Sequence, residues 1–272
     1  MSQFRLEFGG QRLRTIAATL ATAALLGACG TTKDEFAGQS NEKLYADARE
    51  EVANGNYEKG AKIYEKLKGR AAGTLMAQQA ELELAWTYYK SQEKAQALST
   101  IESFIKLHPS SPALDYALYL QGLINFNDDL GLFGRIAGQD LSERDQQASR
   151  DAYQSYKQLV DQFPESKYAP DARLRMNYIV NTLAAYEVHV ARYYYRRGAY
   201  VAAANRAQQA VQEFSSAPAV EEALYIMMLS YDRLDLPKLH DDAQRVLTKN
   251  FPTSRFLSEG FQRPNKPWWQ LW

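Results

Sequence analysis

The stretch QQAELELAWTYYKSQEKAQALSTIESFIKLHP, residues 78–109, decides the fold of this 272-residue chain. Its small residue Ala85 is followed twelve positions later by Ala97, and Pro109 comes twelve positions after that. A small side chain on each of two helices lets the helices approach closely, and a proline after the second helix ends it. The stretch therefore predicts a helix–turn–helix pair.

The same spacing recurs on both sides of this stretch. Ala48, Ala85 and Gly122 are each 37 positions apart, and Ala152 is followed by Pro164 after twelve. The pattern resembles the tetratricopeptide repeat, a unit of roughly 34 residues with small residues at its eighth and twentieth positions and proline at its thirty-second. The match is strongest in 78–109 and weakest in the first unit, which lacks the closing proline.

The third unit is interrupted by an insert within residues 127–147. Gly122 and Ala152 are 30 positions apart instead of twelve, so about 18 residues are added. Long loops inside compact repeats are usually functional or disordered. The insert carries Leu132, Phe133 and Ile136, which argues against disorder alone and leaves its role open.

The second half of the chain continues the helical pattern. Residues 171–197 contain no glycine or proline and predict one long helix of about 27 residues, or ~40 Å. A further helix to Phe214 and a last pair, 219–233 and 237–250, follow. We expect an all-α, tetratricopeptide-like right-handed solenoid of five helix pairs, about ten helices, over residues 41–251, with a tail at 252–272.

The amino terminus has the order of an export signal. A charged start with Arg5, Arg12 and Arg14 precedes an apolar, alanine-rich run that ends at Ala28, too short to span a bilayer as a stable helix. Residues 1–28 are therefore predicted to be a signal peptide, and 29–40 a polar tether.

Cys29, the only cysteine, follows Leu26-Gly27-Ala28, and this segment resembles the lipobox of bacterial lipoproteins. The resemblance implies cleavage before Cys29, which then carries an S-diacylglycerol and an N-palmitoyl chain; no other cofactor is expected. Gly30, where inner-membrane lipoproteins usually have aspartate, favours the outer membrane. The alternative is an ordinary signal peptide with an unrelated cysteine.

The net charge and the absence of catalytic motifs limit the classes of function that the sequence supports. The chain has 32 basic and 32 acidic residues; removing the three arginines and one glutamate of 1–28 leaves 29 and 31, a net charge of −2. A nucleic-acid partner needs a strong basic excess and is not expected. The three histidines are scattered, no metal or nucleophile motif occurs, and we therefore expect a protein that is not an enzyme.

The repeat resemblance implies a groove, because first helices line the concave face of such arrays. Transferring the groove positions relative to each small residue gives a ladder of aromatic and basic side chains that suits an extended peptide. Arg49 or Lys90 is then the candidate for a terminal carboxylate. The alternative for each residue is a place in the core between stacked pairs. The predicted groove residues are Tyr45, Arg49, Trp86, Tyr89, Lys90, Tyr119 and Phe126.

A second candidate surface lies at the end of the long helix. Arginine and tyrosine are enriched at protein interfaces, although basic residues in a last turn also complement the helix dipole. The predicted partner-binding residues are Arg192, Arg196, Arg197, Gly198 and Tyr200.

Two stretches, FIKLHP at 104–109 and YYYRRGAYV at 193–201, together with the lipobox and the five pairs, resemble the BamD (ComL) family. The resemblance implies a lipoprotein on the periplasmic face of the outer membrane that folds β-barrel proteins into it. It would dock on a POTRA domain of BamA, with Arg197 at that interface, bind unfolded barrel proteins and contact other assembly-machine lipoproteins. The rival is a generic tetratricopeptide scaffold of the envelope, associated with peptidoglycan or division.

The tail ends in Trp268-Trp269-Gln270-Leu271-Trp272. Three hypotheses remain for it: a membrane-interface anchor, a docking strip for a partner, and a ligand of the chain's own groove.

Overall fold

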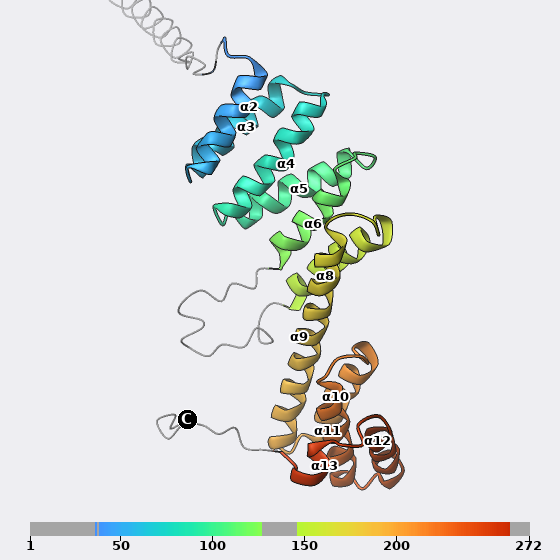
Figure 1. Ribbon diagram of the computed structural model, residues 1–272. Coiled ribbons are helices and arrows are strands. Elements are labelled where there is room, and N and C mark those ends of the chain that lie inside the picture. Colours follow the sequence, from blue (N-terminus) through green and yellow to red (C-terminus); the bar gives the residue numbers. More distant parts are fainter. Residues whose placement is uncertain (1–35, 37, 127–145, 262–272) are drawn as a thin grey trace, which may run out of the picture.

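The computed structural model describes residue 36, residues 38–126 and residues 146–261 (Figure 1). The described residues form an elongated array in which each described helix up to residue 250 packs against the next along the chain. This confirms the all-helical, tetratricopeptide-like fold, and the predicted last pair agrees with α11 and α12 within a residue. The helices are α2 (Asn41–Ala53), α3 (Tyr57–Arg70), α4 (Leu75–Lys90), α5 (Lys94–Leu107), α6 (Leu114–Asn125), α8 (Gln146–Gln162), α9 (Ala169–Arg196), α10 (Tyr200–Glu213), α11 (Val220–Arg233), α12 (Pro237–Asn250) and α13 (Arg255–Glu259).

Small side chains hold the pairs together, as the spacing predicted. Ala48, Ala85, Ala97 and Ala152 are fully buried. Gly122 is also buried, and a Cβ atom there would lie 2.4 Å from the ring of Tyr156. The crossing of α6 over α8 therefore needs a glycine on one helix so that a large ring on the other can fill the space.

The long helix α9 joins the two ends of the molecule (Figure 1). It packs against α8, which precedes it in the sequence, and against α10 and α11, which follow it. Pro170 stands in its first turn, where the missing N–H costs nothing. Gly198, with φ of +78°, reverses the chain after it, a backbone conformation that glycine adopts without strain.

One turn recurs between units. In each copy a backbone N–H bonds the carbonyl three residues back, as in Ser111 to His108, Ser166 to Phe163 and Ser254 to Phe251. The last copy, Phe251-Pro252-Thr253-Ser254, leads into α13, so α13 begins a sixth first helix that stops after five residues. The sequence prediction placed these residues in the tail at 252–272; the structure packs the start of that segment against α11.

The start of the tail closes the open end of the array. The ring of Phe256 stacks on Tyr225 at 5.5 Å, and Phe261 lies 5.1 Å from Tyr225 and 5.7 Å from Tyr195, between ring centroids. Repeat arrays need such a cap, because the last unit otherwise exposes its stacking face. The remaining tail residues 262–272, and most of the insert, lie outside the described residues.

Two glutamates are buried at the same repeat position, four residues before a small residue. Glu81 precedes Ala85, and Lys68 Nζ lies 3.1 Å from its carboxylate. Glu187 precedes Ala191, and Arg206 Nη1 lies 3.0 Å from its carboxylate. Leucine occupies this position in other units. The two ion pairs therefore specify which helices pack together, and burying their charged groups costs desolvation energy.

Candidate protein-binding surfaces

The first helices of successive units are linked by tyrosine–carboxylate hydrogen bonds. On α2, the hydroxyl of Tyr45 donates to Glu83 on α4 over 3.3 Å. The ring of Tyr45 also meets the buried Tyr64 edge-on at 6.0 Å. Burial, together with the nearby Glu83 carboxylate, raises the pKa of Tyr45, so the hydroxyl stays protonated and able to donate.

The same contact recurs between α6 and α9. The hydroxyl of Tyr119 donates to Asp171 over 2.6 Å, and Arg175 Nε donates to the same oxygen over 2.6 Å. Burial opposes the charged form of Asp171, but these two hydrogen bonds outweigh it and lower its pKa. The ring of Tyr168 stacks on Tyr119 at 4.9 Å. The hydroxyl groups of Tyr45 and Tyr119 on the first-helix face are thus already hydrogen-bonded.

The predicted groove residues of α4 form one cluster. The rings of Trp86 and Tyr89 lie 5.5 Å apart and are half-buried. Lys90 Nζ is 5.7 Å from the Trp86 ring.

A similar contact between a cation and a ring occurs on α2, where the Arg49 guanidinium is 6.0 Å from the Tyr45 ring. Both cations are exposed, and neither has a carboxylate partner among the described residues. Each therefore combines an apolar contact with a free positive charge.

Phe126 is not part of this surface. Its side chain is only 8% exposed and belongs to the core around α6, α8 and α9. The ring of Phe126, the residue that follows α6, meets Tyr178 of α9 edge-on at 5.8 Å. Of the predicted groove residues, six stay accessible or partly accessible: Tyr45, Arg49, Trp86, Tyr89, Lys90 and Tyr119.

The sequence prediction missed the acidic members of the first-helix face. Glu83 and Asp171 occupy it together with the predicted tyrosines, and the basic Arg175, also missed, pairs with Asp171. Glu83 is two residues before Ala85, and Asp171 is in the first turn of α9, so no common spacing marks them. Only the stacking of units places them beside tyrosines 38 and 52 residues away.

At the end of α9 the predicted partner-binding residues divide into two groups. Arg192 makes a bidentate ion pair with Glu222 of α11, so its guanidinium serves the packing of the two helices, and its side chain is only partly exposed. Arg197 is exposed and lies 5.5 Å from the Tyr193 ring. Arg196 is exposed without an ion-pair partner in the described part of the chain. Tyr200 packs on Tyr195 at 5.5 Å.

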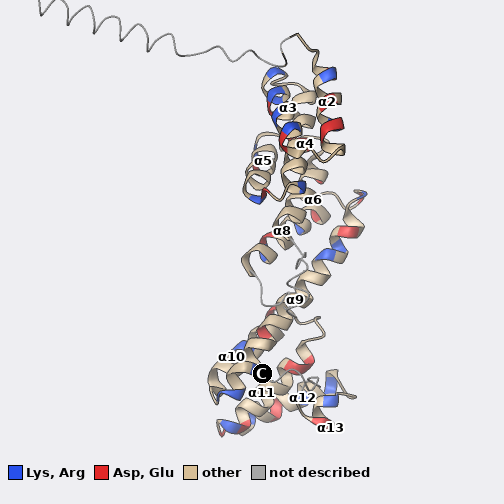
Figure 2. Ribbon diagram, turned by 90° about the vertical axis from the view of Figure 1, so that its left-hand side faces the viewer, with Lys and Arg blue, Asp and Glu red and all other residues tan. Residues whose placement is uncertain are grey.

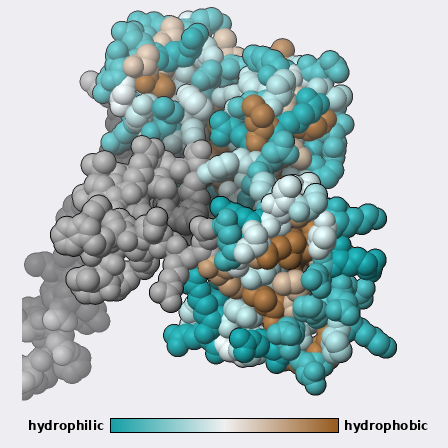
Figure 3. All heavy atoms as spheres, turned by 60° about the horizontal axis from the view of Figure 1, so that its bottom comes forward, coloured by the Kyte–Doolittle hydropathy of each residue, from teal (hydrophilic) through white to brown (hydrophobic). Residues whose placement is uncertain are grey.

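The outer surface contains no large apolar patch on the face shown in Figure 3, where hydrophobic residues form small islands among hydrophilic ones. Within the described ranges, no group of three or more His, Cys, Asp and Glu residues is arranged to hold a metal ion. No described helix has the length and apolar character to cross a membrane. Cys29 lies outside the described residues.

Paired helices with ordered aromatic and basic side chains on their first helices define a helical-repeat scaffold of the tetratricopeptide type. The family described as "YfiO: Outer membrane lipoprotein" matches residues 37–247. A protein of Neisseria meningitidis serogroup B, named "Outer membrane protein assembly factor BamD", is 45% identical over 266 residues, 96% of this chain and 100% of its own. The chain therefore belongs to the BamD family, as its motifs predicted.

More distant similarities complete the comparison. The protein of the same name from Xylella fastidiosa (strain Temecula1) is 33% identical over 94% of this chain and 87% of its own. Among solved structures, the type IV pilus biogenesis factor PilW aligns with 82% of this chain and 98% of its own, at a TM-score of 0.37 and 14% identity. The last similarity is too distant to carry an argument.

Proposed function

We propose that this protein is a lipid-anchored scaffold on the periplasmic face of the outer membrane, where it takes part in the assembly of β-barrel proteins. The family and the name shared by its relatives support this role. The proposal has three parts: an acyl anchor at Cys29, a groove for substrate peptides, and a docking site for BamA.

The anchor part rests on the lipobox. Cysteine thiolate forms the thioether, and more than one acyl chain is needed for stable membrane attachment. Cys29→Ser is expected to abolish acyl labelling and to leave an unanchored precursor. Labelling that persists in the variant contradicts the anchor.

The groove part rests on one observation: Arg49 and Lys90 are exposed beside aromatic rings on the first-helix face, without carboxylate partners in the described residues. A C-terminal strand of a barrel protein offers aromatic side chains and a terminal carboxylate. Tyrosine and tryptophan supply large contact areas at a low cost in side-chain entropy. We therefore assign this face to an extended peptide that ends in an aromatic residue.

A peptide titration tests the groove. Binding of a fluorescent barrel C-terminal peptide is compared with that of the same peptide carrying a C-terminal amide. Amidation should weaken binding to the unmodified protein, and Arg49→Glu or Lys90→Glu should both weaken binding and remove the effect of amidation. Lys238→Glu, an exposed change on α12, is the control and should behave as the unmodified protein. Equal binding of both peptides to the unmodified protein rules out carboxylate recognition.

Crosslinking locates the peptide independently of charge. Photo-reactive residues at positions 45, 86 and 119 should capture barrel peptides. Capture only at positions 190–200 contradicts the groove.

The docking part concerns Arg196, Arg197, Gly198 and Tyr200 at the end of α9, as a contact for a POTRA domain of BamA. Among the described residues the Arg197 guanidinium contacts only an exposed ring, so Arg197→Glu should leave the fold intact. Reversal of a charge in a desolvated pair costs about 2–5 kcal/mol of binding, and BamA should no longer co-purify. Arg173→Glu, an exposed arginine near the other end of α9, is the matched control. Unchanged co-purification with Arg197→Glu contradicts this part and favours the generic envelope scaffold.

A further inference from the structure

Two of the three most exposed large apolar side chains of the described residues lie at one edge of the array. Leu75, in the first turn of α4, is 73% exposed, and Leu107, the last residue of α5, is 64% exposed. Ser111, in the turn after α5, donates to Gln78 of α4 over 3.0 Å. This contact places the end of α5 beside the start of α4, so the two leucines share an edge.

The amino-terminal segment joins the fold at the same edge. Arg70, the last residue of α3, donates to the backbone carbonyls of Phe36 and Gln39 over 3.3 and 2.8 Å. The Phe36 side chain packs against the core of the first unit. The chain is therefore attached to the fold from Phe36 onward, next to the turn that leads into Leu75.

The length of the tether limits how far this edge can be from the lipid. Seven residue steps separate Cys29 from Phe36, and an extended chain spans at most ~3.5 Å per residue. The reach is therefore ~25 Å. A tether of this length keeps the point where the chain joins the fold, beside the end of α3, within about 25 Å of the lipid.

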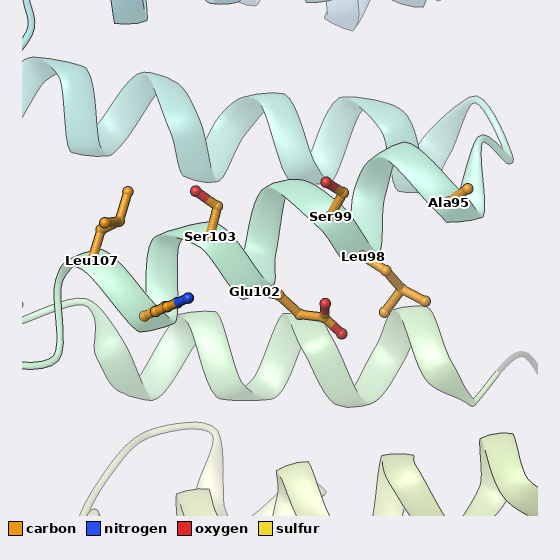
Figure 4. Close-up of a pocket in the computed structure, with 7 residues that line it drawn as sticks. Ala95, Leu98, Ser99, Glu102, Ser103 and Leu107 are labelled. Carbon is orange, nitrogen blue, oxygen red and sulfur yellow. The ribbon is translucent and has the colours of Figure 1, made fainter.

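The charge of the edge agrees with a lipid neighbour. Arg70 bonds only carbonyl groups, and Lys106 is exposed and has no ion-pair partner within the described ranges. Figure 2 shows Lys and Arg along α3 at this end, next to both acidic and basic residues on α2. Figure 4 shows Leu107 at the end of a shallow hollow of about 630 Å³ along α5, where its side chain projects from the last turn. Exposed leucines beside lysine and arginine are the side chains that bind an anionic membrane interface.

We propose that Leu75 and Leu107 contact the lipid surface and hold this edge of the first two units against the membrane. The inference rests on the proposed acyl anchor at Cys29, because the short tether brings the edge there. The contact fixes the orientation of the array, since a lipid chain alone leaves the domain free to rotate. The far end, at α11 to α13, is then directed away from the tether.

Fluorescence quenching tests the contact on the full mature chain, lipid-modified and reconstituted into vesicles of phosphatidylethanolamine and phosphatidylglycerol. With Cys29 acylated, an introduced cysteine is the single free thiol for an environment-sensitive fluorophore. Labels on Leu75→Cys and Leu107→Cys should shift to shorter emission wavelengths and lose most of their intensity when lipids carry a spin label. A label on Val201→Cys, 60% exposed at the start of α10, is the matched control and should stay bright.

A second variant separates the leucines from simple proximity. A label on Ala72→Cys, in the exposed α3–α4 turn, should also be quenched. Combining it with Leu75→Ser and Leu107→Ser should reduce quenching to the level at position 201. Equal quenching with and without the leucines overturns the inference, as does a bright label at both 75 and 107. The acyl mass of each preparation is measured, and its absence refutes the anchor itself and this inference with it.

Discussion

The substitution Gly122→Ala tests how closely α6 and α8 must approach. A Cβ atom at position 122 would lie 2.4, 2.6 and 2.7 Å from three ring carbons of Tyr156. The Tyr156 ring is fully buried, and the Tyr119 ring lies 6.0 Å away on one side. The ring therefore has no open space to enter, and either it or a helix must shift.

Two opposing effects set the magnitude. Alanine is favoured over glycine within a helix by about 1 kcal/mol, whereas overpacking a buried site typically costs about 1–3 kcal/mol and sometimes more. Contacts under 3 Å with three ring atoms place this site at the upper end. We expect Gly122→Ala to lower the free energy of unfolding by about 2 kcal/mol, which is the upper overpacking cost less the helix preference of alanine.

The assay is urea unfolding of the non-lipidated mature chain, followed by circular dichroism. Gly69→Ala is the control, because a Cβ atom there meets nothing within 4 Å; it should raise stability by about 0.5 kcal/mol. Tyr156→Leu should recover part of the loss caused by Gly122→Ala. Tyr156→Phe should not, because the clash involves ring carbons and not the hydroxyl. A Gly122→Ala protein at least as stable as the unmodified one refutes this account of the α6–α8 crossing.

Three further predictions concern charge and backbone. Lys68→Ala should lower the free energy of unfolding, measured in urea, by about 1–3 kcal/mol, because the buried carboxylate of Glu81 loses its lysine partner and keeps only His108 nearby. Glu81→Leu should be neutral or stabilising. The reverse order of stabilities contradicts this. The pKa of Asp171 is lowered in the folded protein. Its carboxylate therefore stabilises the fold fully above the unfolded pKa of about 3.9, and this stabilisation is lost as the pH falls through the folded pKa. Asp171→Asn should make the free energy of unfolding depend less on pH below about pH 4, and an unchanged pH dependence there excludes this role. Gly198 has a φ of +78°, so Gly198→Ala should lower the free energy of unfolding by about 1–2 kcal/mol. Thermal melting measures this, and a higher melting temperature in the variant contradicts it.

The sequence alone was sufficient to predict the helical repeat. Small residues twelve positions apart and the prolines that end second helices are local signals, because helix geometry and chain termination depend on neighbouring residues. For this reason the predicted 171–197 helix agrees with α9 to within two residues at each end. The recurrence of Phe-Pro-x-Ser at 163–166 and 251–254 is also visible in the sequence and, once recognised, predicts the start of α13.

What surrounds each side chain depended on the tertiary structure. The positions of Phe126 and Arg192 suggested exposed binding residues, but Phe126 turns into the core and Arg192 pairs with Glu222, 30 residues away. Nothing in the sequence around Glu81 indicates that Lys68 and His108 lie next to it. The physical reason is that repeat spacing fixes where each helix begins and ends, whereas the rotation of one helix against the next is set by packing across units. That rotation decides which side chains stay free to bind a partner.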